Sequence, residues 1–401
     1  MKSELNNRFF LYLCLEDQKK SLEYLLSSSK EEKEDLVESS YKYRLEKLFM
    51  DFIKKNKLED TFSERSLKAL ESNILLFSAH NLDLINSGIK ISKVLSENSI
   101  NHLFLKGFYL SNFSYQQISD RVMRDIDLLV HPDSLDQTYK VVNEMGFRFK
   151  NSKSDSPKGN LLERYDLPVM IDNKGLHLEI HYRIFQQNNT LKCELSNQML
   201  QNPIKKNIGK NILPFASVEL NFIHLLYHAT KKEFFAPGPL LLKDLRLIIN
   251  DLNLDYELLK KYITEFGLKK EASLIQGISS DAGNPIFPHK DYLELDIPKE
   301  IRCISSDLIL KKGIHRSLIP IFNQSSLYSK IKHIFSLFLP NKIKVSGEFQ
   351  IREASLSIYM YHFLRLKRQI IFSVLEVFNY LFKRNLTNAK QYEKVIKFLE
   401  D

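Results

Sequence analysis

Two aspartates stand one residue apart in an otherwise apolar stretch of the chain. Asp125 and Asp127 flank Ile126 within the run Asp125–Val130 and directly follow Arg124. Side chains alternate along a strand, so both carboxylates would project from one face, about 6.6 Å apart at roughly 3.3 Å per residue. Two negative charges in an apolar run are costly unless a cation neutralises them. The pattern therefore predicts a metal site rather than two turn or cap residues, with one divalent cation or two cations about 3.5–4 Å apart.

A third carboxylate, on a later expected strand, is a candidate to join this pair as a metal ligand. The turn sequence Asp172–Gly175 separates two expected strands, 167–171 and 176–184. The second strand alternates apolar residues with a polar set, His177, Glu179, His181 and Arg183. A face of this kind either lines a site or meets water. Glu179 is therefore either a metal ligand or a solvent-facing residue of an edge strand, and the two histidines are interpreted as ordinary strand residues.

Basic residues that precede the carboxylates could handle phosphate. Lys106 and Gly107 end a short expected strand, before a helix over 108–115. Gly107 would let the backbone at the start of this helix approach a phosphate group. Lys106 could contact phosphate or pair with a carboxylate, and the same two roles are open to Arg121 and Arg124.

Composition indicates a folded globular protein. The chain has 401 residues, which is enough for two or three domains. Of these residues 43% are hydrophobic, which argues against disorder. Its 58 basic and 49 acidic residues give a net charge of +9, which suits nucleotides, nucleic acid or an anionic membrane surface and selects none of them.

The cysteines and the apolar runs point to the cytoplasm. Cys14, Cys193 and Cys303 are odd in number and far apart, so we expect neither a disulfide framework nor a cysteine zinc site. Acidic residues such as Glu16 interrupt the apolar residues near the N-terminus, which argues against a signal peptide. No apolar run reaches the ~20 residues of a transmembrane segment.

The pattern of apolar residues changes twice along the chain. Residues 1–95 show helical spacing, residues 96–215 mix expected strands with helices, and residues 216–401 return to helix. In the middle region Ser134 and Gln137 are spaced as a capping box at the start of a helix. In the last region Ser217 could cap a helix that runs to about Thr230, and Pro237, Gly238 and Pro239 break the chain before a helix near 241–252.

Two features of the last region have more than one interpretation. His224 and His228 are spaced i, i+4, which suits packing or contact with a substrate, or a zinc ion if a third ligand exists elsewhere. Near the C-terminus the aromatic residues Tyr359, Tyr361, Phe363, Phe372 and Phe378 mix with arginines and lysines. This mixture is typical of an amphipathic packing helix, and a peripheral membrane or nucleic-acid contact is the alternative.

Several spaced blocks of the sequence resemble a bacterial family of uncharacterised nucleotidyltransferases. The blocks are Leu105-Lys106-Gly107, Arg121-Val122-Met123-Arg124-Asp125-Ile126-Asp127-Leu128-Leu129-Val130, Gly146-Phe147, Leu178-Glu179-Ile180-His181 and Lys243-Asp244-Leu245. This family lies within the superfamily typified by DNA polymerase beta, in which a glycine turn, an Asp-x-Asp strand and a later acidic residue follow in this order. The resemblance covers roughly residues 40 to 250.

The resemblance implies a fold and a reaction. The fold would be α/β (α+β), a small mixed-sheet nucleotidyltransferase core at 96–215 between an N-terminal helical region and a C-terminal helical domain. The donor would be a nucleoside triphosphate such as ATP, bound near Lys106, Gly107, Arg121 and Arg124. Asp125, Asp127 and Glu179 would be catalytic and would ligate two Mg²⁺ ions, or Mn²⁺ in their place, and Glu179 would help deprotonate an acceptor hydroxyl.

One residue departs from the superfamily pattern. Many members have a serine after the glycine, whose hydroxyl reaches the phosphate, and here the residue is Phe108. This favours a second hypothesis, a catalytically degenerate module that binds a nucleotide or a protein. A third hypothesis is an RNA-directed or toxin-like nucleotidyltransferase. For the acceptor we favour a small molecule, peptide or protein over nucleic acid.

Overall fold

A mixed sheet and the helices around it make up the part of the chain that the computed structural model describes. This part comprises residues 8–150, 166–185, 190–288, 293, 295–311 and 393–399, with the backbone alone for 190–194. The seven strands of the sheet follow the order β3-β4-β5-β2-β1-β7-β6. They are β1 His102–Phe104, β2 Asp125–Val130, β3 Arg148–Phe149, β4 Met170–Ile171, β5 His177–His181, β6 Ile204–Ile208 and β7 Asn211–Phe215. The mixed α/β fold that the sequence predicted is confirmed.

The centre of the sheet is fixed by two kinds of pairing. β1 runs antiparallel to β2, with Phe104 opposite Leu128, and β2 runs parallel to β5. Residues 126–130 of β2 are all buried, and the strand is accordingly apolar in all but one of these positions. The parallel register places Asp127 beside Glu179 and Asp125 beside His177.

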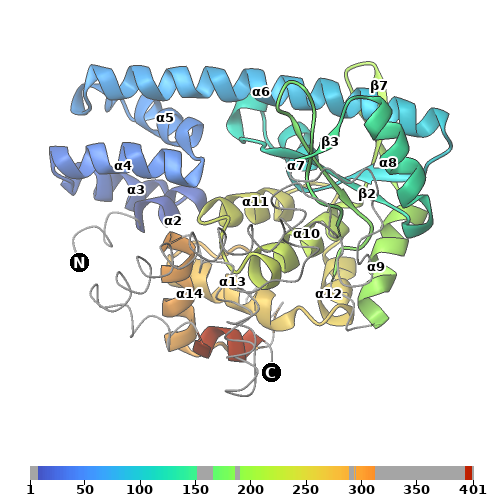
Figure 1. Cartoon of the computed structure of the whole chain (residues 1–401). Coiled ribbons are helices and arrows are strands. Elements are labelled where there is room, and N and C mark those ends of the chain that lie inside the picture. The colour runs from blue at the N-terminus through green and yellow to red at the C-terminus, as the bar shows by residue number, and fades with distance from the viewer. Residues whose placement is uncertain are drawn as a thin grey trace, which may run out of the picture.

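The N-terminal helical region is held together by aromatic packing. Its helices are α2 Arg8–Cys14, α3 Gln18–Ser27, α4 Lys30–Tyr43, α5 Glu46–Lys55 and α6 Glu64–Glu97. The rings of Phe9, Phe10 and Phe49 meet edge to face with centroids 5.1 to 5.8 Å apart. Figure 1 shows α6 running along one side of the whole molecule, from α5 to the sheet.

The core region has three further helices, α7 Lys106–Phe113, α8 Leu135–Glu144 and α9 Thr190–Gln201. The turn at Asp172–Gly175 joins β4 to β5 as predicted, with the amide of Gly175 donating to the carbonyl of Asp172. The predicted capping box at Ser134 is wrong, because the side chain of Ser134 makes no capping hydrogen bond. Ser134 ends a 3₁₀ turn that begins at Pro132, so its backbone lacks the extended conformation that a capping side chain requires.

The helices after the sheet pack below it in the view of Figure 1. They are α10 Val218–Tyr227, α11 Leu240–Ile249, α12 Tyr256–Glu265, α13 Lys269–Asp281 and α14 Lys299–Lys311. Ser217 caps α10 as predicted, by accepting from the amide of Leu220. The helix predicted to run to about Thr230 is α-helical only as far as Tyr227. The next residues, His228–Lys232, form a π-helix. The proline-glycine break precedes α11, close to its predicted start.

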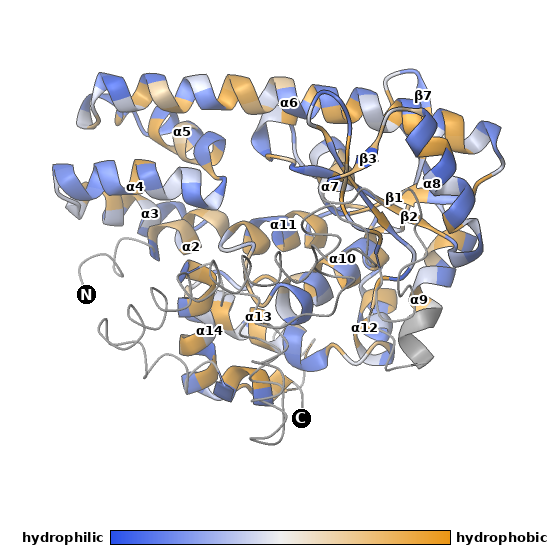
Figure 2. Cartoon of the chain, in the orientation of Figure 1, coloured by the Kyte–Doolittle hydropathy of each residue, from blue (hydrophilic) through white to orange (hydrophobic). Residues whose placement is uncertain are grey.

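Apolar residues line the inside of this arrangement. In Figure 2 the strands near β1 and β2 are mostly hydrophobic, and the outer faces of the helices are mixed. Among the helices that the structure describes, none is both long and apolar enough to cross a membrane. The C-terminal aromatic and basic residues from Tyr359 to Arg384, and most of the helix predicted after residue 301, lie outside the described residues. The predicted domain boundaries near 95 and 215 remain predictions.

Candidate active site

The parallel register of β2 and β5 brings two of the predicted carboxylates together. Asp127 is 3% exposed, and its neighbour Glu179 is about a quarter exposed, at 25% of its side chain. Ligand atoms of Asp127, Glu179 and His181 all lie within 4.8 Å of one another. Asp125 is partly buried and lies on the same face of β2, two residues before Asp127. The structure therefore gathers three carboxylates and one imidazole on one face of β2 and β5.

His181 is the neighbour that the sequence did not single out as a site residue. Its Nε2 lies 2.8 Å from Asp127 Oδ1 and 3.7 Å from Glu179 Oε2. Burial lowers the pKa of His181 to about 4, and Lys106 adds to this effect. The imidazole is therefore neutral at pH 7, and a neutral imidazole can donate to Asp127 or bind a cation. In the sequence, this role of His181 was indicated by its position on the same polar face of the strand as Glu179.

The sequence left two roles open for Lys106, contact with phosphate or pairing with a carboxylate, and the structure shows the pairing. Its Nζ forms an ion pair with Asp127 Oδ1 and lies 3.5 Å from His181 Nε2. Lys106 also has a φ of +43°, a conformation that is uncommon for residues other than glycine. Strained backbone of this kind persists where the surrounding structure enforces it, and here it brings the lysine to the carboxylates from the first turn of α7.

The charges of the carboxylates are unequal. Burial raises the pKa of the Glu179 carboxyl to about 7, and the charge of Asp127 adds to this rise. The pKa of Asp125 rises to about 6 for the same two reasons. Burial also acts to raise the pKa of Asp127, but Lys106 and the hydrogen bond with His181 outweigh it and hold this pKa well below its usual range. Asp127 is thus ionised, whereas Asp125 and Glu179 lose their protons only near pH 6 and pH 7, unless a cation stabilises their charged forms.

This arrangement fits a divalent cation such as Mg²⁺. The donor set is mostly carboxylate oxygen, which a hard cation prefers, and Glu179 is accessible to solvent. Crowded carboxylates with raised pKa values are groups that bound positive charge would ionise. Asp127, Glu179 and His181 could hold such a cation, and Asp125 on the same face of β2 is a further candidate ligand.

The pKa values predict how Mg²⁺ stabilises the fold at different pH. Asp and Glu normally titrate near pH 4, so the folded protein keeps protons on Asp125 and Glu179 that the unfolded chain loses between about pH 4 and 7. These two groups therefore reduce the free energy of unfolding as the pH rises through this range. Mg²⁺ binds the ionised forms, so we expect it to raise the melting temperature more at about pH 8 than at about pH 5.5.

Thermal unfolding with and without millimolar Mg²⁺ measures this difference. The double variant Asp125→Asn/Glu179→Gln is the control, and its response to Mg²⁺ should be small and the same at both pH values. An equal Mg²⁺ shift of the wild-type melting temperature at the two pH values would contradict the assignment of these carboxyls to a cation site.

Arg121 supports the glycine turn. Its Nε and a terminal nitrogen each lie 2.9 Å from an oxygen of Asp244, which also accepts a hydrogen bond of 2.7 Å from Tyr115. A Cβ on Gly107 would lie 2.6 Å from the other terminal nitrogen of Arg121. Glycine therefore allows the guanidinium to pass against the first turn of α7. The carboxylate that pairs with Arg121 is thus Asp244, whereas Arg124 is exposed.

The side chain of Phe108 points into the core. Its ring stacks on Phe104 with the centroids 4.5 Å apart, and it also stacks on Phe215. A Cβ on Gly88 of α6 would lie 2.5 Å from the Phe108 ring, so α6 approaches this ring closely. Phe108 is therefore a packing residue that joins α6, α7 and the sheet, and it contributes no polar group to the site.

The predicted histidine pair lies within the electrostatic reach of the same site. Burial lowers the pKa values of His224 and His228 well below normal, and Lys106 adds to this effect at both. Their ring centroids are 6.0 Å apart, and His224 Nδ1 is buried without a hydrogen-bond partner among the described residues. In the described part of the chain, these two histidines belong to no cluster of three metal ligands. This favours packing or substrate contact over a zinc site.

Lys232 is a further basic residue at the site that the sequence did not indicate. It ends the π-helix, and its Nζ lies 3.6 Å from Asp166 Oδ2. Burial lowers its pKa, and Lys106 adds to this effect, whereas Asp166 and Glu179 act in the opposite direction. π-Helical turns occur often at functional sites. Beyond the lysine, Phe234 and Phe235 have φ values of +44° and +64°, which are uncommon for residues other than glycine.

The comparisons with known proteins agree with this geometry at the level of the family. No curated protein matches the chain. The profile of a family described as uncharacterised nucleotidyltransferases matches residues 29–279. This range runs from the N-terminus of α4 to α13 and contains the three carboxylates, Lys106 and Asp244. The chain therefore belongs to this nucleotidyltransferase family.

Proposed function

We propose that the protein transfers a nucleoside monophosphate from a nucleoside triphosphate to an acceptor hydroxyl and releases pyrophosphate, with Mg²⁺ as its cofactor. The observation that carries this proposal is the pairing of Asp127 with Glu179 on neighbouring parallel strands, with Asp125 on the same face. Membership of a nucleotidyltransferase family supports the reaction class.

The three carboxylates would together ligate two Mg²⁺ ions. Asp125 and Asp127 would ligate both ions, and Glu179 would ligate the ion nearer the acceptor. When bound, the ions neutralise charge on the α-phosphate and align the attacking and leaving oxygens. Asp127 suits the shared position because Lys106 and His181 keep it ionised and fix its orientation.

Residues of the chain also prepare the acceptor and the phosphates. With Mg²⁺ bound, the Glu179 carboxyl would be ionised, and the carboxylate could accept a proton from the acceptor hydroxyl. The N-cap residue of α7, Leu105, makes no side-chain capping hydrogen bond, so the start of this helix could donate backbone hydrogen bonds to phosphate oxygens, and Lys106 adds positive charge beside it. Lys232 and the neutral His224 and His228 suit contact with the acceptor. We infer that this acceptor is a small molecule, peptide or protein.

Calorimetry tests the proposal at the level of donor binding. Each of the four nucleoside triphosphates is titrated into the wild type and into Asp125→Asn/Asp127→Asn, with and without Mg²⁺. The expected result is binding of at least one triphosphate that requires both Mg²⁺ and the two aspartates. Asp133→Asn/Asp136→Asn is the matched control, since it removes two exposed carboxylates outside the site. Triphosphate binding that is as strong without Mg²⁺ as with it, or as strong in Asp125→Asn/Asp127→Asn as in the wild type, would contradict the proposal.

Phe108 supports one competing function, a module that binds nucleotide without transferring it. Its ring is buried where many superfamily members place a hydroxyl against the phosphate. This function predicts triphosphate binding with no release of pyrophosphate under any acceptor condition. A pyrophosphate-release assay with a small-molecule and peptide extract as acceptor source therefore separates the two functions.

A further inference from the structure

Lys150 and His177 form a basic pair beside the candidate site. Lys150 Nζ lies 3.3 Å from His177 Nε2. His177 is the first residue of β5, and the parallel register places it opposite Asp125 of β2. Lys150 directly follows β3, the strand at one edge of the sheet, and its amide donates to the carbonyl of Val169. The pair therefore connects the start of β5 to the end of the edge strand.

The register of the strands sets this pair on the face of the sheet that carries the carboxylates. Residues directly opposite each other on neighbouring strands project from the same face. Ile171 of β4 is opposite both Arg148 of β3 and His177 of β5. All three therefore share the face of Asp125, which is opposite His177 on β2. Lys150 is two residues beyond Arg148 and returns to this face by alternation, in agreement with its contact with His177.

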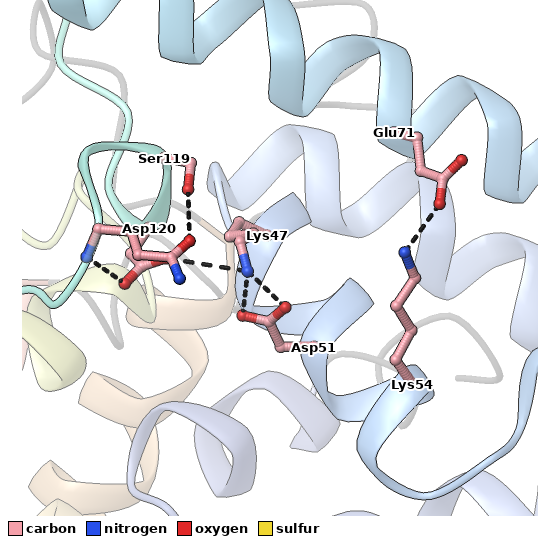
Figure 3. A network of polar contacts seen from close by, with 7 residues as sticks. Lys47, Asp51, Lys54, Glu71, Ser119 and Asp120 are labelled. Carbon is pink, nitrogen blue, oxygen red and sulfur yellow. Dashed lines mark hydrogen bonds and ion pairs between the residues drawn. The ribbon is translucent and has the colours of Figure 1, made fainter.

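Lys150 lacks an acidic partner of the kind that several other lysines of the protein have. Figure 3 shows such a case, in which Lys54 Nζ of α5 lies 2.8 Å from Glu71 Oε1 of α6. Among the described residues, by contrast, neither Lys150 nor His177 forms an ion pair with a carboxylate. Lys150 is exposed and His177 is partly exposed, so both side chains are open to a ligand. An ammonium and an imidazole in contact offer hydrogen-bond donors that an oxyanion would match.

The order of the strands places this pair on the acceptor side of the carboxylates. Lys106 and α7 follow β1 and reach Asp127 from that side of β2. Glu179, which the proposed function places nearest the acceptor, lies on β5, on the opposite side of β2. His177 lies on β5 as well, and Lys150 follows β3, still farther from β1. An oxyanion bound by this pair would therefore belong to the acceptor rather than to the triphosphate.

We propose that Lys150 and His177 bind an oxyanion group of the acceptor, a phosphate or a carboxylate. This inference rests on the proposed function and narrows the acceptor to molecules that carry both a hydroxyl and such a group. His177 and Glu179 are two residues apart on β5, so the two groups of the acceptor should lie roughly 7 Å apart. The basic pair would thereby select the acceptor by its charge and place its hydroxyl beside Glu179.

Three probe molecules of similar length test this subsite. 4-Hydroxybutyl phosphate and 5-hydroxypentanoate each carry a hydroxyl and an oxyanion, whereas 1,4-butanediol carries no charge. The donor site is first filled with Mg²⁺ and the α,β-methylene analogue of the triphosphate that calorimetry identifies, because this analogue cannot release pyrophosphate. Ligand-observed NMR then measures the affinity of each probe. At least one anionic probe should bind about 10-fold more tightly than the diol, as for a charge-assisted hydrogen bond, and the tighter one identifies the group.

Variants of the basic pair show whether it makes this contact. Lys150→Ala and His177→Phe should each weaken binding of the preferred anionic probe about 10-fold and leave the affinity for the diol unchanged. Lys150→Arg keeps the charge and should bind this probe within about threefold of wild type. Lys54→Ala is the matched control, because it removes an exposed lysine outside the site, and its affinities should equal those of wild type.

Two results would overturn the subsite while leaving the proposed function intact. In the first, neither anionic probe binds wild type more tightly than the diol does. In the second, Lys150→Ala and His177→Phe bind the anionic probes as tightly as wild type. Wild type that binds no triphosphate in the presence of Mg²⁺ would overturn the proposed function and, with it, this inference.

Discussion

Replacing Asp127 by asparagine is expected to reduce Mg²⁺-dependent turnover by about a thousandfold or more. Asp127 is the most buried of the three carboxylates and the one that Lys106 and His181 keep ionised. In the proposed mechanism, losing its charge removes a shared ligand of both metal ions, and a loss of this size corresponds to about 4 kcal/mol of transition-state stabilisation. The measurement is pyrophosphate release from the bound triphosphate, with a small-molecule and peptide extract as acceptor source.

The same substitution also affects the fold, and a second variant separates the two effects. Asp127→Asn leaves the charge of Lys106 buried without its partner, which costs about 3–5 kcal/mol when a buried ion pair is broken. Lys106→Met/Asp127→Asn removes both charges and should recover most of the stability without recovering turnover. Exposed Asp133→Asn should behave as wild type. An Asp127→Asn enzyme that retained a tenth of wild-type turnover would exclude Asp127 as a metal ligand.

Asp244→Asn is expected to destabilise the protein by about 3–5 kcal/mol, because it leaves Arg121 buried and charged without its counter-ion. Burial acts to lower the pKa of Arg121, but Asp244 outweighs it and holds this pKa above normal, so the guanidinium stays charged. The midpoint of urea unfolding measures the loss. Triphosphate affinity should also fall, since the Arg121 guanidinium is no longer fixed against Gly107.

The pair formed by Arg302 and Asp281 provides a matched comparison. It has the same two-point geometry, with distances of 2.8 and 3.2 Å, but 42% of the Asp281 side chain is exposed. Water and mobile ions screen such a pair, so Asp281→Asn should cost at most about 1 kcal/mol. Similar losses in the two variants would show that burial does not set the strength of the Arg121–Asp244 pair.

The elements that carry the chemistry could be predicted because their patterns are local. The alternation in β2 and β5, the turn at Asp172–Gly175 and the cap at Ser217 each depend on a few consecutive residues. The expected link between Asp127 and Glu179 depended on the polar face of the second strand. The sequence could not give the parallel register that places them opposite each other.

What the sequence did not indicate depends on distant or subtle features. The partnership of Arg121 with Asp244 joins residues far apart in the chain, and their chemistry alone does not select it over a pair with Asp125 or Asp127. The β6–β7 hairpin was not predicted, although Gly209 has the positive φ of a tight turn. The π-helix at His228–Lys232 has only five residues, about one turn, so apolar periodicity cannot reveal it.

The length of α6 has a consequence for motion. At 1.5 Å per residue its 34 residues form a rod of roughly 50 Å that packs against α5 at one end and against β2, β7 and α8 toward the other. Domain closure normally pivots about a few loop residues, and a continuous helix offers no such pivot. The N-terminal helices and the sheet are therefore braced as one body. A ligand that touches both would then bind without an entropic penalty for bringing two domains together.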